Sequence, residues 1–161
     1  MKEALKRARK GLAQGEVPVG AVVVCEGKVI ASGYNRRTAT QTALSHAEMY
    51  AIDRACKKCG SWRLPDCDLY VTLEPCPMCM GAALNARIRK IYFGAYEQKG
   101  RSMTRELAKS NLLNHTLEVE GGVLEEECSA ILSGFFRDMR GKGRQAAAER
   151  TPAEGEGPFA Q

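Results

Sequence analysis

The sequence predicts an α/β domain, a three-layer α/β/α sandwich whose central mixed sheet has about five strands. Three observations predict this class. Helical and strand-like apolar patterns alternate along the chain in the order helix, hairpin, helix, strand, helix, strand and closing helix. The hairpin requires antiparallel pairing, whereas the strand–helix–strand portion in the middle favours parallel pairing. The length of 161 residues suits one domain with an adequate core.

The first half of the chain is expected to form a helix, a hairpin and a second helix. Apolar residues recur at helical spacing in "LKRARKGL", which predicts a basic amphipathic helix near the N-terminus. The stretch "VGAVVVCEGKVIASG" predicts a β-hairpin, with Glu26 and Gly27 as its turn. A helix is expected to begin near Ser45 and to end by Gly60.

The second half is expected to alternate strands with helices. The stretch "CDLYVTLEP" predicts a buried strand, and a helix from about Cys76 to Asn85 follows it. "KIYFGAY" predicts the next strand and "TLEVEGGV" a shorter one. A closing amphipathic helix is expected over residues 124–139.

The end of the chain differs in composition. "GKGRQAAAERTPAEGEGPFAQ" is rich in Gly, Ala, Glu and Pro and almost without large apolar residues, which is typical of disorder. We therefore expect one domain over residues 1–140 and a disordered tail over residues 141–161.

Composition favours a cytoplasmic protein. Seven cysteines are an odd number, and the basic start "MKEALKRARKGLAQGE" lacks the apolar segment of a secretory signal. The longest apolar run, from Val17 to Cys25, is far shorter than the ~20 residues of a membrane helix. The net charge of +5 is compatible with an anionic partner. In a reducing compartment, cysteines are more often metal ligands or buried thiols than disulfides.

The stretch "SHAE" allows two interpretations. Ser45 and Glu48 match the S-x-x-E capping box, in which each side chain satisfies a backbone N–H at a helix start. On that interpretation His46 is an ordinary residue of the first turn. Alternatively, His46 is a metal ligand and Glu48 a catalytic carboxylate.

The stretch "EPCPMCMGAAL" favours the second interpretation. Cys76 and Cys79 form a C-x-x-C directly after a strand and at the start of a helix, where free N–H groups and the helix dipole favour a thiolate. His46 has the same position on the preceding helix, so both helix starts can meet at one edge of the sheet. One imidazole and two thiolates leave a fourth tetrahedral position for water, which is typical of catalytic zinc.

A second C-x-x-C offers a rival site. Cys56 and Cys59, with Cys76 and Cys79, give C-x₂-C-x₁₆-C-x₂-C, a spacing found in structural zinc sites. Such a site would make the protein a non-catalytic four-cysteine module. The first pair falls near a helix end, however, and the site would leave His46 without a role. The remaining cysteines are best interpreted as small buried hydrophobic residues: Cys25, Cys67 and Cys128.

The combined pattern His46-Ala47-Glu48 and Pro75-Cys76-x-x-Cys79 resembles the zinc-dependent cytidine and adenosine deaminase superfamily. In order, "GEVPVGAVVV", "HAEMYAI", "LYVTLEPCPMCMGA", "ARIRKIYFGA", "GGVLEEEC" and "LSGFFR" are similar to the bacterial tRNA adenosine deaminases. The resemblance implies a cytidine deaminase-like fold and a homodimer with one Zn²⁺ per subunit. It also implies hydrolysis of the wobble adenosine of an arginine tRNA anticodon to inosine.

The resemblance also implies roles for individual residues. His46, Cys76 and Cys79 would hold the zinc, and Glu48 would transfer protons. Asn35 would hydrogen-bond the substrate, although a turn residue at a strand exit is an equal interpretation from the sequence. The base pocket would be formed by Val17, Ala47 and Pro75, and the nucleic-acid contacts by Lys99, Phe136, Arg137 and Arg140.

One region departs from the family. Glu97 stands where an aspartate is usual, and residues 97–113 replace a loop of small residues with a run of longer side chains that is compatible with a helix. The departure leaves the zinc chemistry intact and keeps a second hypothesis open, a deaminase of a free base or nucleoside such as guanine, cytosine or cytidine.

Overall fold

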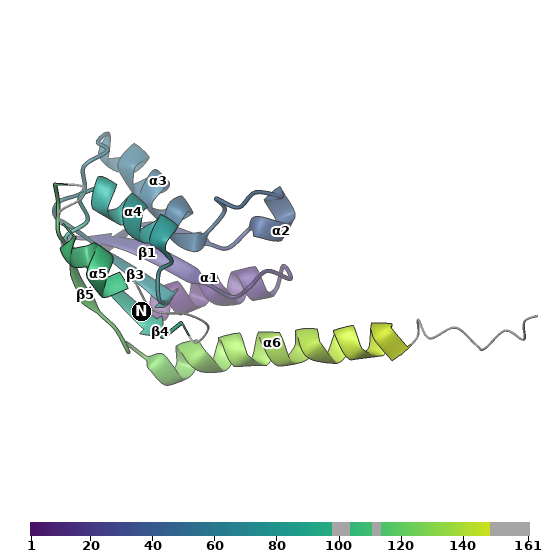
Figure 1. The fold of residues 1–161 in the computed structure, drawn as a ribbon. Coiled ribbons are helices and arrows are strands. Elements are labelled where there is room, and N and C mark those ends of the chain that lie inside the picture. The colour runs from purple at the N-terminus through teal and green to yellow at the C-terminus, as the bar shows by residue number, and fades with distance from the viewer. Residues whose placement is uncertain (98–103, 111–113, 149–161) are drawn as a thin grey trace, which may run out of the picture.

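The computed structural model of the chain describes residues 1–97, 104–110 and 114–148. A five-stranded mixed sheet in the order β2-β1-β3-β4-β5 lies between two layers of helices, which confirms the predicted three-layer α/β/α class (Figure 1). The strands are β1 Gly20–Cys25, β2 Lys28–Tyr34, β3 Cys67–Leu73, β4 Lys90–Ala95 and β5 Glu118–Glu120. The helices are α1 Lys2–Leu12, α2 Arg37–Thr40, α3 Ala47–Cys59, α4 Pro77–Asn85, α5 Thr104–Lys109 and α6 Glu125–Ala148.

Strand pairing follows the sequence patterns. β1 and β2 form the predicted antiparallel hairpin, and both turn residues have positive φ, 50° at Glu26 and 73° at Gly27, as a tight hairpin turn requires. β3 pairs antiparallel with β1 and parallel with β4, with α4 as the crossover. β4 and β5 are also parallel. Because β3 and β4 are parallel, the segment after each strand leaves at the same edge of the sheet.

The core lies on both faces of the sheet. Leu69, Val71 and Ile91 are fully buried, as is Phe93 apart from 2% of its surface. Burying a side chain of this size contributes about 1.5–3 kcal/mol. These four residues lie on one face of the sheet, because Leu69 pairs with Ile91 and Val71 with Phe93. The opposite face packs against α1 and α6, since a Cβ atom at Gly20 would overlap Ala4 and one at Gly94 would overlap Cys128.

The start of α3 rests directly on β2 at Gly33. A Cβ atom at this residue would overlap the carbonyl oxygen of Ala47 and lie 2.7 Å from Cβ of Tyr50. Glycine is therefore required for the helix backbone to approach the strand this closely. This contact fixes the height of the first turn of α3 above the sheet.

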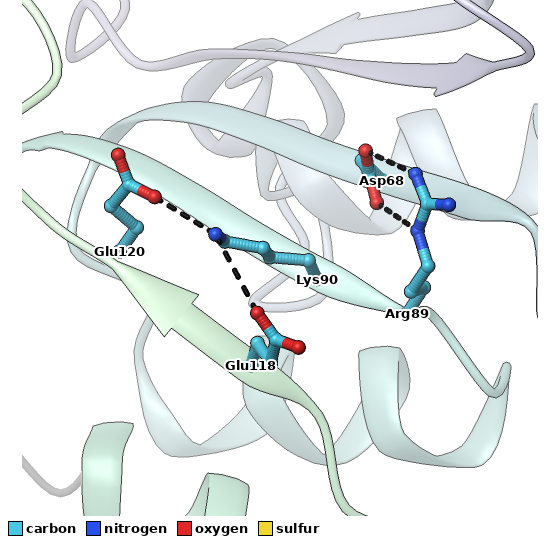
Figure 2. Close-up of polar contacts among 5 residues, drawn as sticks. All are labelled: Asp68, Arg89, Lys90, Glu118 and Glu120. Atoms are coloured by element: carbon cyan, nitrogen blue, oxygen red, sulfur yellow. Dashed lines mark hydrogen bonds and ion pairs between the residues drawn. The ribbon is translucent and has the colours of Figure 1, made fainter.

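The far end of the sheet carries a set of paired charges (Figure 2). Arg89 donates from Nε and Nη2 to the two carboxylate oxygens of Asp68, at 2.9 and 2.8 Å. Lys90 lies 2.8 Å from a carboxylate oxygen of Glu120 and 3.6 Å from one of Glu118. The Lys90 pairs tie β4 to β5, and the Arg89 pair ties β3 to the residue before β4. One partner of each pair is largely exposed, and such ion pairs contribute little, about 0–1 kcal/mol each.

Two features differ from the sequence-based expectations. The short helix α2 was not predicted. The last helix runs to Ala148, so the expectation of disorder from residue 141 is corrected for residues 141–148. Arginine, glutamine and alanine are strong helix formers and outweigh the two glycines of this stretch. The rest of the predicted tail, residues 149–161, lies outside the described residues.

In the described part of the chain, no helix is long and apolar enough to span a membrane.

Candidate metal centre and active site

Three side chains that could hold a metal ion converge where α3 and α4 begin. The imidazole of His46 and the sulfurs of Cys76 and Cys79 all lie within 4.8 Å of one another. Nδ1 of His46 is 3.5 Å from Sγ of Cys79 and 3.7 Å from Sγ of Cys76. Within the described ranges, this is the one cluster of three such residues with metal-binding spacing.

Helix starts place these ligands. His46 is the N-cap of α3 and Cys76 the N-cap of α4, whose first helical residue, Pro77, has the fixed φ that a helix start needs. Cys79 lies in the same first turn. Neither N-cap side chain, His46 or Cys76, makes a capping hydrogen bond, and the positive dipole end of each helix lies at the cluster.

The electrostatics of the cluster suit a cation. A hydrogen bond from Cys79 and a second from His46 lower the pKa of Cys76 to about 4, so this sulfur is a thiolate at neutral pH. The neighbouring Cys76 sulfur and burial raise the pKa of Cys79. The hydrogen bond to Cys76 raises the pKa of His46. One thiolate is thus present, and a bound cation would displace the protons of the other two ligands.

Glu48 is buried beside the cluster with an unsatisfied oxygen. The residue is 3% exposed, and Oε2 has no hydrogen-bond partner. Burial raises the pKa of this carboxyl group. A buried polar atom without a partner is costly and indicates either a missing ligand or a catalytic role. Its position next to three metal-binding side chains fits both.

The capping-box interpretation of "SHAE" is wrong. The N-cap of α3 is His46 rather than Ser45, and the His46 side chain makes no capping hydrogen bond. The Ser45 hydroxyl lies instead 2.7 Å from that of Thr40 and 3.0 Å from that of Tyr50.

The rival four-cysteine site is not formed. Cys56 and Cys59 lie in the last turn of α3, at the opposite end of the helix from His46. The Cys56 thiol donates to the carbonyl of Trp62 at 3.7 Å. Neither cysteine joins the cluster of His46, Cys76 and Cys79. The donor set is therefore one nitrogen and two sulfurs, which matches an open zinc site rather than a closed one.

Asn35 connects β2 to the candidate site. Its side-chain oxygen accepts a hydrogen bond from the backbone N–H of Ala47 at 3.0 Å, and the residue is 6% exposed. It is thus more than a turn residue, because it holds the first turn of α3. Its contact with substrate stays a prediction, as do those of the three pocket residues, of which Ala47 and Pro75 are buried and Val17 half-buried.

The predicted nucleic-acid contacts fall in two places. Phe136 and Arg140 of α6, together with Leu73, Ala95 and Tyr96, line a cavity of about 350 Å³ beyond the ends of β3 and β4. Arg137 is exposed on α6 and does not line this cavity. Lys99 lies outside the described residues.

Four polar residues near the site were missed by sequence analysis. Glu74 accepts a hydrogen bond from the backbone N–H of Glu97, and Thr104 donates to the carbonyl of Pro75, so the divergent segment is tied to the residues that precede Cys76. Glu16 and Tyr50 hold the loop before His46. Three of them lie in stretches that resemble the family, but the contacts of Glu16, Glu74 and Thr104 join residues 22 to 29 positions apart. Sequence periodicity carries no signal for such contacts.

Comparison with known proteins agrees with this geometry. Residues 1–140 match the MafB19-like deaminase family. A tRNA-specific adenosine deaminase of Bacillus subtilis (strain 168) is 50% identical over 148 residues, which cover 91% of this chain and 92% of the relative. A solved structure from a study of A-to-I editing by tRNA:A34 deaminases at the wobble position has a TM-score of 0.76 and 42% identity, covering 82% and 97% of the two chains. A guanine deaminase from Bacillus subtilis has a TM-score of 0.56 and 42% identity, over 59% of this chain and 61% of that one.

Proposed function

Since the chain belongs to the MafB19-like deaminase family and has tRNA-specific adenosine deaminases among its relatives, we propose that it hydrolyses adenosine to inosine at the wobble position of a tRNA anticodon. The observation that carries this proposal is the unsatisfied carboxylate of Glu48 beside His46, Cys76 and Cys79. A deaminase needs both parts, because one group must activate water and another must move its protons.

The three ligands would hold Zn²⁺, one ion per subunit. Their atoms are close enough to share one cation, and an imidazole with two thiolates is a donor set that zinc accepts. When bound, zinc lowers the pKa of a water molecule from its bulk value of ~15.7 toward neutrality.

Glu48 would be the general base and then the general acid. Its carboxylate would take one proton from the attacking water and deliver it to the purine ring nitrogen. It would then take the second proton of that water, from the hydroxyl now on the ring carbon, and deliver it to the amine, which departs as ammonia. The water oxygen becomes the carbonyl oxygen of inosine, so atoms and charge balance. Burial raises the pKa of Glu48, which helps the carboxyl group to keep the proton between the two transfers.

The residues around the ligands would shape the pocket for the base. Ala47 and Pro75 directly follow and precede zinc ligands, so their placement is tied to that of the metal. Val17 would form the remaining wall, and Asn35, whose oxygen is committed to Ala47, would use its side-chain N–H₂ as a donor to the substrate. Phe136, Arg137 and Arg140 would contact the RNA on either side of the target nucleotide, with Lys99 as a further phosphate contact.

A cytoplasmic homodimer acting on an arginine tRNA completes the proposal. The excess of positive charge suits a polyanionic partner. The paired charges in Figure 2 are neutralised within the protein, so the excess lies elsewhere on the molecule. Light scattering tests the dimer, and anticodon stem-loops of different tRNAs test the choice of tRNA.

Deamination of a free base is the second candidate. It is favoured by the likeness to a guanine deaminase and by the divergent residues 97–113. Within that segment, Glu97 and Thr104 form hydrogen bonds to Glu74 and Pro75 beside the site. The partial overlap with that guanine deaminase weighs less than the likeness to the tRNA-specific enzyme along nearly its whole length.

One assay separates the two functions. Ammonia release is measured from an anticodon stem-loop with adenosine at the wobble position, and in parallel from free adenine, guanine, cytidine and cytosine. A stem-loop with guanosine at that position is the matched control. We expect release from the adenosine stem-loop alone. Release from free compounds only would reject the RNA assignment.

A further inference from the structure

Glu16 is a buried acid that the proposed chemistry does not use. It is 2% exposed and lies in the loop between α1 and β1. Its carboxylate accepts hydrogen bonds from the backbone N–H groups of Thr38, at 3.2 Å, and of Ala39, at 2.8 Å. Burying a carboxylate is unfavourable unless hydrogen bonds compensate it, and these two donors come from a segment 22 and 23 residues away.

The segment that Glu16 holds is the loop before His46, residues 36–45, here called the site loop. It contains α2, which has four residues and is too short to be stable alone. Its two ends are joined, because the N–H of Arg36 donates to the carbonyl of Ser45 at 3.0 Å. Thr40 links both ends, since its hydroxyl donates to the carbonyl of Arg36 and contacts the hydroxyl of Ser45, each at 2.7 Å.

These contacts make the site loop a single unit that Glu16 connects to the rest of the chain. At its C-terminal end, the hydroxyl of Ser45 lies 3.0 Å from that of Tyr50 in α3. On the other side, Glu16 connects the loop to the rest of the chain through charge-assisted hydrogen bonds, which are roughly twice as strong as neutral ones. Removing the carboxylate would therefore free α2 while the base of the loop stays closed.

The start of α3 has anchors that do not involve Glu16. Asn35 accepts the N–H of Ala47, and Gly33 lets the helix rest on β2. The N–H of His46 donates to the carbonyl of Leu44 in the site loop at 2.8 Å, but the first turn of α3 is held independently by β2. An effect of Glu16 on the loop can thus be separated from an effect on the metal ligands.

The site loop presents side chains to solvent next to the candidate site. Leu44 is 61% exposed, and Arg37 is exposed and close enough for its charge to act on His46. An exposed apolar side chain and a cation beside a catalytic cluster suit the nucleotides that flank a reacting base, through contact with a base face and with a phosphate.

We propose that Glu16 is a positioning residue, which holds the site loop as the wall against which the RNA flanking the target adenosine binds. This inference rests on the proposed function for the identity of the substrate. Glu16 does not touch the reacting atoms, and it acts on binding of a long substrate rather than on the chemical step.

The test compares two substrates and two variants. Glu16→Gln keeps the size of the side chain but removes the charge and one acceptor, and Thr40→Val loosens the same loop from inside without touching Glu16. The substrates are an anticodon stem-loop and free adenosine, which lacks the flanking nucleotides. Glu26→Gln, in the exposed hairpin turn, is the control.

We expect Glu16→Gln to raise KM for the stem-loop by about 10-fold, the effect of losing one charge-assisted hydrogen bond, and Thr40→Val, which removes neutral hydrogen bonds, to raise it by about 3-fold. The kcat value, the zinc content and KM for free adenosine should stay within about 2-fold of the wild type. Amide hydrogen exchange should accelerate at Thr38 and Ala39 while α3 stays protected.

Three results would overturn the inference: an unchanged KM for the stem-loop, an equal loss with both substrates, or loss of zinc from Glu16→Gln. If the wild type deaminates no RNA, the proposed function fails and hydrogen exchange alone decides the positioning role. Unchanged exchange at Thr38 and Ala39 would then reject that role as well.

Discussion

The chain contains the same short motif twice, at opposite ends of two neighbouring helices. Cys76 and Cys79 form a C-x-x-C at the N-terminus of α4, and Cys56 and Cys59 form another in the last turn of α3. In the first pair, hydrogen bonds from Cys79 and His46 lower the pKa of Cys76 to about 4. In the second, burial and the nearby Asp53 raise the pKa of Cys56.

Helix direction acts in the same sense as these causes. Free N–H groups at a helix start stabilise a thiolate, whereas free carbonyl groups at a helix end destabilise it. A C-x-x-C is therefore a metal-binding motif only in combination with its place on a helix and with a third ligand. Here His46 supplies that ligand from a second helix start.

The largest expected effect comes from removing a ligand of the first pair. In Cys76→Ser, the weakly acidic hydroxyl replaces a thiolate, so zinc should be lost and deamination of the stem-loop should fall below detection. Metal analysis and ammonia release are the measurements. Retention of both zinc and activity would show that the two pairs do not differ as proposed.

The next effect concerns Glu48, which separates metal binding from chemistry. We expect Glu48→Gln, and likewise Glu48→Ala, to keep about one zinc ion per chain while activity falls by about 10²–10⁴-fold, because only proton transfer is lost. Zinc content and single-turnover deamination are measured on the same preparation. Loss of zinc from these variants would mean that Glu48 is a ligand and that the site is closed.

Metal removal should change the melting temperature differently in variants of the two cysteine pairs. A chelator should lower the melting temperature of the wild type, since zinc at about 1,000 times its dissociation constant stabilises the folded state by about 4 kcal/mol. Cys76→Ser should show no further loss with chelator, whereas Cys56→Ser should respond as the wild type does. Calorimetry with and without chelator measures this, and an equal response of both variants would contradict a single metal site.

The smallest effect is expected at the second pair. The double variant Cys56→Ser and Cys59→Ser should keep zinc and activity within about 2-fold and lose at most about 1 kcal/mol of unfolding free energy, since Cys59 is exposed and Cys56 only partly buried. Denaturant unfolding and metal analysis provide the measurements. Loss of zinc here would restore the four-cysteine hypothesis.

Sequence patterns predicted the sheet and the convergence of the site because both depend on local signals. Alternating β-branched residues and the turn at Glu26 and Gly27 predict the hairpin, and a strand followed by Cys76 predicts a ligand at the edge of the sheet. Local signals failed where a competing side-chain contact decides the outcome. Ser45 and Glu48 match a capping box, yet Ser45 is engaged with Thr40 and Tyr50.

The same reasoning explains the other differences. Helix α2 exists because Glu16 satisfies its first N–H groups, and no pattern within its four residues predicts it. Helix α6 continues beyond residue 140 because composition rich in alanine is typical of both disordered tails and helices, and propensity decides between them. The role of Asn35 was open from the sequence because an amide side chain suits turns and active sites equally.

Gly33 bears on a metal ligand that it never touches. The first turn of α3 lies on bare strand backbone at this residue, and even one methyl group would displace the turn that begins with His46. Coordination bonds tolerate shifts of only about 0.2 Å. The distance from the imidazole to the two sulfurs therefore depends on the absence of a side chain at residue 33. A Gly33→Ala substitution, which adds only a methyl group, would move His46 away from the position that metal binding needs.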